Sequence, residues 1–149
     1  MTEGPEKDYQ RARLSAMNML ARREQSRKEL ENKLGTRFEA DVINRVLDDL
    51  KSEGLQSDQR FLESFVSSRI NRGQGPLKIS YELRNKGIAM EAIADQLEPY
   101  AENWLEIAKY VLERKFGEEP PADYKERQKR QRFIASRGFP NDVCYKLFD

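Results

Sequence analysis

Basic side chains supply most of the chemistry that this sequence could perform, and they gather in two stretches. Residues 124–137 contain six lysines or arginines against one acid, and residues 76–86 contain three against one acid. Lysine and arginine bind phosphate and carboxylate groups through charge and hydrogen bonds. We therefore expect a positive surface, the basic strip, that binds a phosphate backbone or an acidic protein face. Its candidate residues are Arg69, Arg72, Lys78, Arg84, Lys86, Lys125, Arg127, Lys129, Arg130 and Arg132.

The same charges also allow a plainer interpretation, in which they only solvate helix faces. Charged helices often pair their side chains at i,i+4 without binding a partner. Residues 26–34, with three bases and two acids, fit that interpretation, whereas residues 124–137 have too few acids to pair their bases. Tyr81 and Tyr124 lie near the strip and could stack on nucleic-acid bases. We expect them instead to pack between helices with the hydroxyl pointing outward.

Catalytic groups are scarce in this chain. The sequence has no histidine and one cysteine, Cys144. These counts exclude Cys–His and Ser–His–Asp nucleophile arrangements and a zinc site built from histidine and cysteine. The glycines after Arg72 lack the spacing of a phosphate-binding P-loop and predict a turn between helices. We expect no enzyme, no cofactor and no metal, and we expect Cys144 to be a small buried core residue.

Composition predicts an all-α chain. It has 149 residues and a net charge of +1, with 38% hydrophobic and 36% charged residues, and helix formers dominate. One cysteine allows no intramolecular disulfide. No apolar stretch is long enough for a membrane span, and the N-terminus lacks the apolar core of a secretory signal, so a cytoplasmic protein is the expectation.

Apolar periodicity and helix-end signals define the elements that would position the basic residues. Ser26 and Glu29 form the pattern of a capping box, and Pro76 and Gly87 frame a helix that buries one side. The first helix is expected to bury Leu14, Met17 and Leu20, spaced three apart. The nine expected helices cover approximately residues 8–23, 26–34, 38–53, 57–72, 76–86, 88–98, 104–116, 124–137 and 139–148.

Equivalent apolar positions recur along the chain with a nearly constant period. Phe38, Ile88 and Phe139 each follow a turn and are 50 and 51 positions apart. This predicts three tandem three-helix repeats, over residues 8–54, 55–98 and 99–149, that form an elongated, curved molecule with the basic middle helices along one surface. The alternative is one irregular helical bundle without a true repeat.

Several motifs resemble the RecX family of recombination regulators. Ser26-Arg-Lys-Glu-Leu30 matches the start of a second helix. A second match is Leu55-Gln-Ser-Asp-Gln-Arg-Phe61, followed by Phe65 and Ser68-Arg69. The most specific match is Gly75-Pro-Leu-Lys-Ile79 with Glu82-Leu83 and Lys86-Gly-Ile88. The segment Phe133-Ile-Ala-Ser-Arg-Gly-Phe139 resembles the family's closing segment. Together these motifs span nearly the whole chain in the family's order.

The resemblance implies three tandem three-helix repeats and a small cytoplasmic modulator of the RecA recombinase, which we expect to be a monomer. Such a protein would bind the groove of the RecA filament on single-stranded DNA and lower ATP hydrolysis, strand exchange and RecA-assisted repressor cleavage. Some family members also bind DNA weakly by themselves. Among the candidate residues, Arg69, Lys78 and Lys86 coincide with the family motif, and the others depend on charge placement alone. The alternative function is an all-α DNA-binding protein that acts without RecA.

Overall fold

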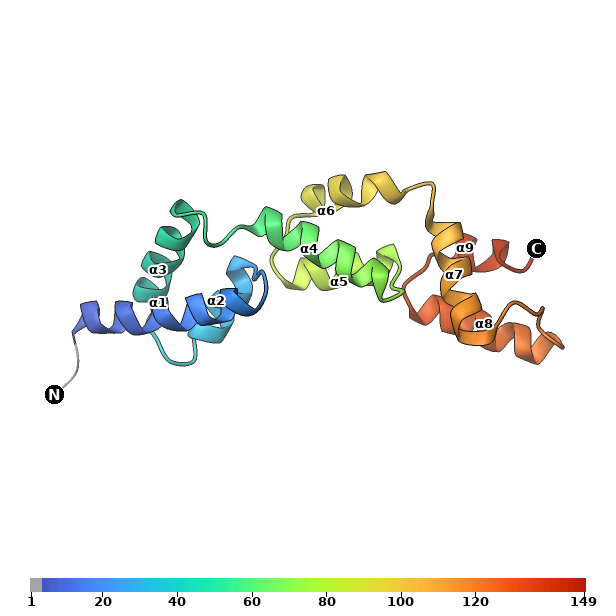
Figure 1. Cartoon of the computed structure of the whole chain (residues 1–149), viewed down its shortest axis with the longest axis horizontal. Coiled ribbons are helices and arrows are strands. Elements are labelled where there is room, and N and C mark those ends of the chain that lie inside the picture. Colours follow the sequence, from blue (N-terminus) through green and yellow to red (C-terminus); the bar gives the residue numbers. More distant parts are fainter. Residues whose placement is uncertain (1–3) are drawn as a thin grey trace. The chain divides into compact units, whose positions relative to one another are not determined.

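The structure is a computed structural model that describes residues 4–149, and its regular elements are all helical (Figure 1). The all-α prediction is therefore confirmed. No described helix combines the length and apolar character that a membrane span requires. The elements are α1 (Pro5–Arg22), α2 (Arg27–Leu34), α3 (Ala40–Ser52), α4 (Asp58–Asn71), α5 (Pro76–Asn85), α6 (Met90–Leu97), the 3-10 helix η1 (Glu98–Tyr100), α7 (Trp104–Phe116), α8 (Tyr124–Ser136) and α9 (Asn141–Lys146).

The chain divides into two compact units, which we describe separately. Unit 1 holds the described part of Met1–Ser64 together with Asn85–Ile88, and unit 2 holds Phe65–Arg84 together with Ala89–Asp149. Unit 1 thus contains α1, α2, α3 and the start of α4 up to Ser64. Unit 2 contains the rest of α4, α5, α6, η1, α7, α8 and α9, except that Asn85 at the end of α5 belongs to unit 1.

In unit 1, α1 packs through small residues instead of the large ones that the sequence suggested. Tyr9, Ala12 and Ala16 are buried and face α3, whereas Leu14 is 62% exposed and Met17 is 38% exposed. The predicted face was therefore wrong at Leu14 and Met17. Alanine has no side chain beyond Cβ, so a stripe of alanines lets two helix backbones approach closely. A search for large apolar side chains overlooks such a stripe.

The start of α2 follows its sequence signature. The Ser26 hydroxyl accepts a hydrogen bond from the Glu29 N–H at 3.1 Å, and the Glu29 carboxylate accepts one from the Ser26 N–H at 3.1 Å. This reciprocal pair satisfies two backbone donors that the first helical turn leaves without partners. The capping-box prediction is confirmed, and both residues are buried. A carboxylate is thereby fixed inside unit 1.

In unit 2, Ile79 and Leu83 form the buried side of α5, as their spacing predicts. The turn before α5 docks against the turn after α8 through backbone hydrogen bonds. The Gly75 N–H donates to the Arg137 carbonyl at 2.7 Å, and the Leu77 N–H donates to the Gly138 carbonyl at 2.9 Å. These bonds bring the ends of α4 and α8 close together, which positions the cleft described below.

The aromatic and cysteine predictions have different outcomes in unit 2. Cys144 is 5% exposed and packs in a core with Trp104 and Phe139, so the prediction of a buried cysteine is confirmed. Tyr81 and Tyr124 are 66% and 73% exposed, so the expectation that they pack between helices was wrong. Both lie on exposed sides of their helices, α5 and α8.

Candidate partner-binding surface

The outer side of α8 carries three exposed cations on one helical stripe. Asp123 caps the helix, because its side chain accepts a hydrogen bond from the Glu126 N–H at 2.8 Å. Lys125, Lys129 and Arg132 follow at intervals of four and three residues, which places them on one side of the helix. All three are exposed. We call this stripe of Lys125, Lys129 and Arg132 the α8 basic face.

The α8 basic face has almost no internal partners. Lys125 and Arg132 form no hydrogen bond or ion pair with any residue from 4 to 149, and Lys129 contacts only the Phe116 ring, with Nζ 5.9 Å from the ring centre. Like charges at i,i+4 repel each other modestly. An anionic partner would remove this repulsion, so the stripe is suited to binding phosphate or carboxylate groups.

Arg130 on the same helix has a structural role instead. It is 8% exposed, its Nε lies 3.3 Å from Glu126 Oε1, and its Nη1 donates to the Glu119 carbonyl at 2.8 Å. Its guanidinium also lies 5.2 Å from the centre of the Phe116 ring. The expectation that Arg130 is exposed was therefore wrong. Arg130 follows Lys129 directly, but its side chain points inward and contacts the loop before α8. Arg127 is half-buried beside Phe148, at 5.7 Å from that ring.

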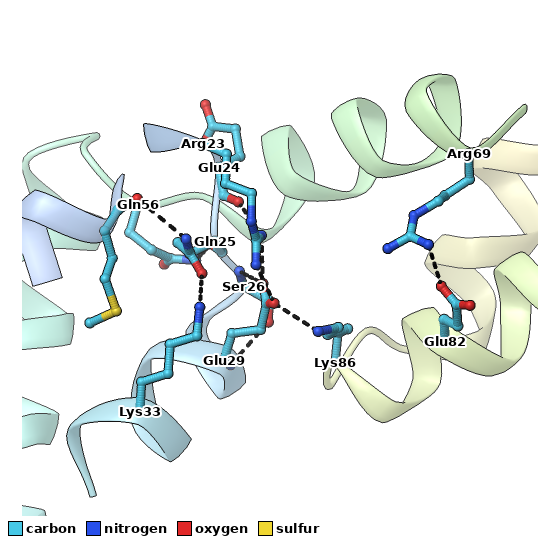
Figure 2. Close-up of polar contacts among 11 residues, drawn as sticks. Arg23, Glu24, Gln25, Ser26, Glu29, Lys33, Gln56, Arg69, Glu82 and Lys86 are labelled. Atoms are coloured by element: carbon cyan, nitrogen blue, oxygen red, sulfur yellow. Dashed lines mark hydrogen bonds and ion pairs between the residues drawn. The ribbon is translucent and has the colours of Figure 1, made fainter. Parts of the chain in front are cut away.

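The candidate residues of the second stretch divide in the same way. Arg69 pairs with Glu82 at 3.1 Å and lies 4.4 Å from the centre of the Phe65 ring, so its charge is neutralised within unit 2 (Figure 2). The side chains of Arg72, Lys78 and Arg84 form no ion pair within residues 4–149. Arg72 and Arg84 are exposed, and Lys78 is half-buried.

Lys86 has an internal partner in unit 1, the buried carboxylate of Glu29. Its Nζ lies 2.8 Å from Glu29 Oε2, and Arg23 Nη2 lies 2.9 Å from the same oxygen (Figure 2). The Glu29 side chain is only 5% exposed. Burial raises the pKa of Glu29, but hydrogen bonds from Arg23, Lys86 and the Ser26 N–H outweigh burial and lower it to about 2. We call these four residues the Glu29 cluster.

The Glu29 cluster changes what Lys86 can do. If the ammonium left Glu29 to bind a partner, a buried carboxylate would lose one of its two cations, which is costly. Lys86 is therefore better suited to holding unit 1 together than to docking. The sequence signals the capping box but not this pair, because 57 positions separate Lys86 from Glu29.

Comparison with known protein families gives three matches, which follow one another along the chain. The family models are described as the first, second and third three-helix domains of RecX, and they match residues 12–50, 57–97 and 101–148. The chain belongs to the RecX family. The expected organisation in three three-helix domains is thereby confirmed, and so is the resemblance to the RecX family.

Individual relatives agree with this assignment. Regulatory protein RecX of Chromohalobacter salexigens is 48% identical over 125 residues, which cover 83% of this chain and 82% of the relative. Regulatory protein RecX of Legionella pneumophila is 42% identical over 90% of both chains. A crystal structure of regulatory protein RecX superposes with a TM-score of 0.76 at 25% identity, covering 95% of this chain and 72% of the other. The crystal structure of RecX from Lactobacillus salivarius has the same fold, with a TM-score of 0.74 at 24% identity over 95% and 94% of the two chains.

Proposed function

We propose that this RecX-family protein binds the RecA filament on single-stranded DNA and lowers RecA's ATP hydrolysis, strand exchange and coprotease activity. The observation that carries the proposal is the match of all three RecX domains, in order, over most of the chain. The relatives are named regulatory proteins, which agrees with a binding role instead of catalysis. The proposal implies a cytoplasmic monomer that acts where RecA filaments form.

The α8 basic face is the surface best suited to this contact. Lys125 and Arg132 are free of internal ion pairs within residues 4–149, so binding an anion costs them no existing partner. Exposed ion pairs contribute only about 0.2–1 kcal/mol each. Several such contacts linked in one protein nevertheless add up through effective concentration. Three repeats, with proposed bounds 8–54, 55–98 and 99–149, would each contribute contacts of this kind.

The test is RecA ATP hydrolysis on single-stranded DNA with and without this protein. The variant K125E/K129E/R132E, called the α8 variant, reverses the α8 basic face and leaves buried Arg130 in place. The charge-matched control R22E/K28E/K51E reverses three exposed cations of unit 1 that form no ion pair within the described residues. We expect inhibition by the wild type and the control, and weaker inhibition by the α8 variant.

The outcomes separate the parts of the proposal. No inhibition by the wild type at stoichiometric excess would refute RecA regulation. Equal inhibition by all three proteins would keep the regulation and move the contact away from α8. Equal loss in the two variants would show that only net charge matters.

The unpaired cations of α8 also favour a second candidate function, DNA binding without RecA. This function predicts binding to bare single-stranded DNA that weakens steeply with salt, because each neutralised phosphate releases counterions. It also predicts that the α8 variant loses this binding. Absence of binding at low salt would exclude the second candidate.

A further inference from the structure

A second positively charged site lies in unit 2, away from the α8 basic face. It is a cleft of about 410 Å³ between the end of α4, the middle and end of α7, and the end of α8. Among residues 4–149, four cations line it and no acid does. The lining residues are Ile70, Asn71, Arg72, Gly73, Ile107, Tyr110, Val111, Arg114, Lys115, Phe133 and Arg137. A cleft of this size lies within the usual range for small-molecule sites, about 300–1,000 Å³.

The four cations of the cleft have no anionic partner within residues 4–149. The Arg72 side chain forms no ion pair, and Lys115 contacts only the Phe133 ring, with Nζ 5.7 Å from its centre. Arg114 donates only to the Tyr110 hydroxyl, at 3.3 Å. Cations gathered without a counter-charge repel each other, so an anion in the cleft would be bound by all of them.

Arg137 places a guanidinium with unused hydrogen-bond donors at the cleft. Its Nη2 donates to the Arg72 carbonyl at 3.2 Å, which fixes the guanidinium at the cleft. Its Nε is buried and has no hydrogen-bond acceptor among residues 4–149. The guanidinium lies 5.6 Å from the centre of the Phe133 ring and forms no other hydrogen bond within residues 4–149, so its remaining donors suit an oxygen-rich anion.

The cleft also offers a flat aromatic surface. Tyr110 is 60% exposed and adjoins Arg114, whose guanidinium lies 5.7 Å from the tyrosine ring centre. Ile107 and Val111 add apolar lining on the same helix. An aromatic ring beside cations is the arrangement that binds a nucleobase by stacking and its phosphates by charge.

We propose that this cleft binds a free nucleoside triphosphate. The phosphates would contact Arg72, Arg114, Lys115 and Arg137, and the base would stack on Tyr110. Four cations around one small cleft suit a triphosphate, which concentrates several negative charges in one place. A nucleic-acid strand, by contrast, brings about one charge per nucleotide. No residue of the α8 basic face lines the cleft, so this proposal does not rest on the proposed regulation of RecA.

Calorimetric titration of the full chain with ATP, at low salt and without RecA or DNA, tests the proposal. Inorganic tripolyphosphate serves as the probe without a base. We expect ATP to bind at least fivefold more tightly than tripolyphosphate, as one stacked base predicts (about 1–3 kcal/mol). Tyr110→Ala should weaken ATP binding to the level of tripolyphosphate and leave tripolyphosphate unchanged. Arg114→Gln should weaken both ligands, and Lys129→Gln on α8 should weaken neither.

The three substituted side chains, Tyr110, Arg114 and Lys129, are exposed, so circular dichroism should show unchanged helicity in every variant. The proposal is overturned if ATP does not bind, or if tripolyphosphate binds as tightly as ATP. It is also overturned if Lys129→Gln and Arg114→Gln reduce binding equally, or if a thymidine oligonucleotide binds while ATP does not. Failure of RecA inhibition would leave this result unaffected, so the two proposals fail independently.

Discussion

Replacing Glu29 by glutamine should destabilise unit 1, because it removes a buried negative charge and one acceptor oxygen. Glutamine has nearly the same shape, and its amide oxygen can still accept the Ser26 N–H, so the capping box is retained. The substitution removes the negative charge that Arg23 and Lys86 contact at 2.9 and 2.8 Å. Both cations are partly exposed, at 50% and 35%, and can be solvated by water when they lose their partner. The substitution therefore removes the ionic contribution of the Glu29 cluster together with the acceptor Oε2, and leaves the capping box in place.

The expected loss of stability follows from the pKa of Glu29. The folded protein lowers this pKa from 4.5 to about 2. At 1.36 kcal/mol per pKa unit, the difference corresponds to about 3 kcal/mol of stability near pH 7. We expect about 2–3 kcal/mol, because the partial exposure of both cations weakens the pairs. For a chain of this size the melting temperature should fall by about 5–10 °C.

The stabilisation by Glu29 should decrease as the pH falls. Because the folded state holds the carboxylate ionised, its stabilisation is fully present above the unfolded pKa of 4.5 and is lost as the pH falls toward about 2. Wild type should thus lose about 2 kcal/mol of this contribution between pH 7 and pH 3. Glu29→Gln has no such carboxylate, so the stability difference between the two proteins should shrink over that interval.

Urea denaturation followed by circular dichroism at pH 7, 5, 4 and 3 measures both effects. The control is Glu31→Gln on the same helix, where the carboxylate is 41% exposed and pairs with Arg27 at 3.0 Å. That exposed pair should contribute only about 0.3–0.5 kcal/mol. The reasoning is refuted if Glu29→Gln costs no more than Glu31→Gln at pH 7. It is also refuted if the difference between wild type and Glu29→Gln stays constant from pH 7 to pH 3.

Three further predictions concern unit 2. Gly138→Ala should destabilise by several kcal/mol in urea, because its Cβ would lie 2.7 Å from the Lys78 backbone nitrogen at a φ of +96°. Gly54→Ala, with a φ of +76° and open space around it, should cost only about 1 kcal/mol, and equal costs would contradict the clash. Burial, and to a lesser extent Asp142, raises the pKa of Cys144, so a thiol reagent at pH 8 should react slowly until urea unfolds the protein; fast native reaction would contradict its burial. The α8 variant should keep wild-type helicity by circular dichroism, and lost helicity would show that its cations are structural.

Several local signals were reliable because they involve residues that are neighbours both in sequence and in space. The capping box at Ser26 and the buried side of α5 at Ile79 and Leu83 follow from spacing within one or two turns. Helical spacing also predicts the α8 basic face. It does not predict the inward orientation of Arg130, which depends on the Glu119 carbonyl in an adjoining loop and on the Phe116 ring of α7.

The sequence by itself determined the helical class, the main apolar faces and the family, because these depend on local periodicity and on motifs. The tertiary structure decided which charges remain available for a partner. It paired Lys86 with Glu29 across 57 positions. It also packed α1 through alanines, which a search for large apolar side chains overlooks. It also brought Arg72, Arg114 and Arg137 to one cleft from three helix ends. Charge is a property of a residue, but its availability depends on distant groups that only folding brings together.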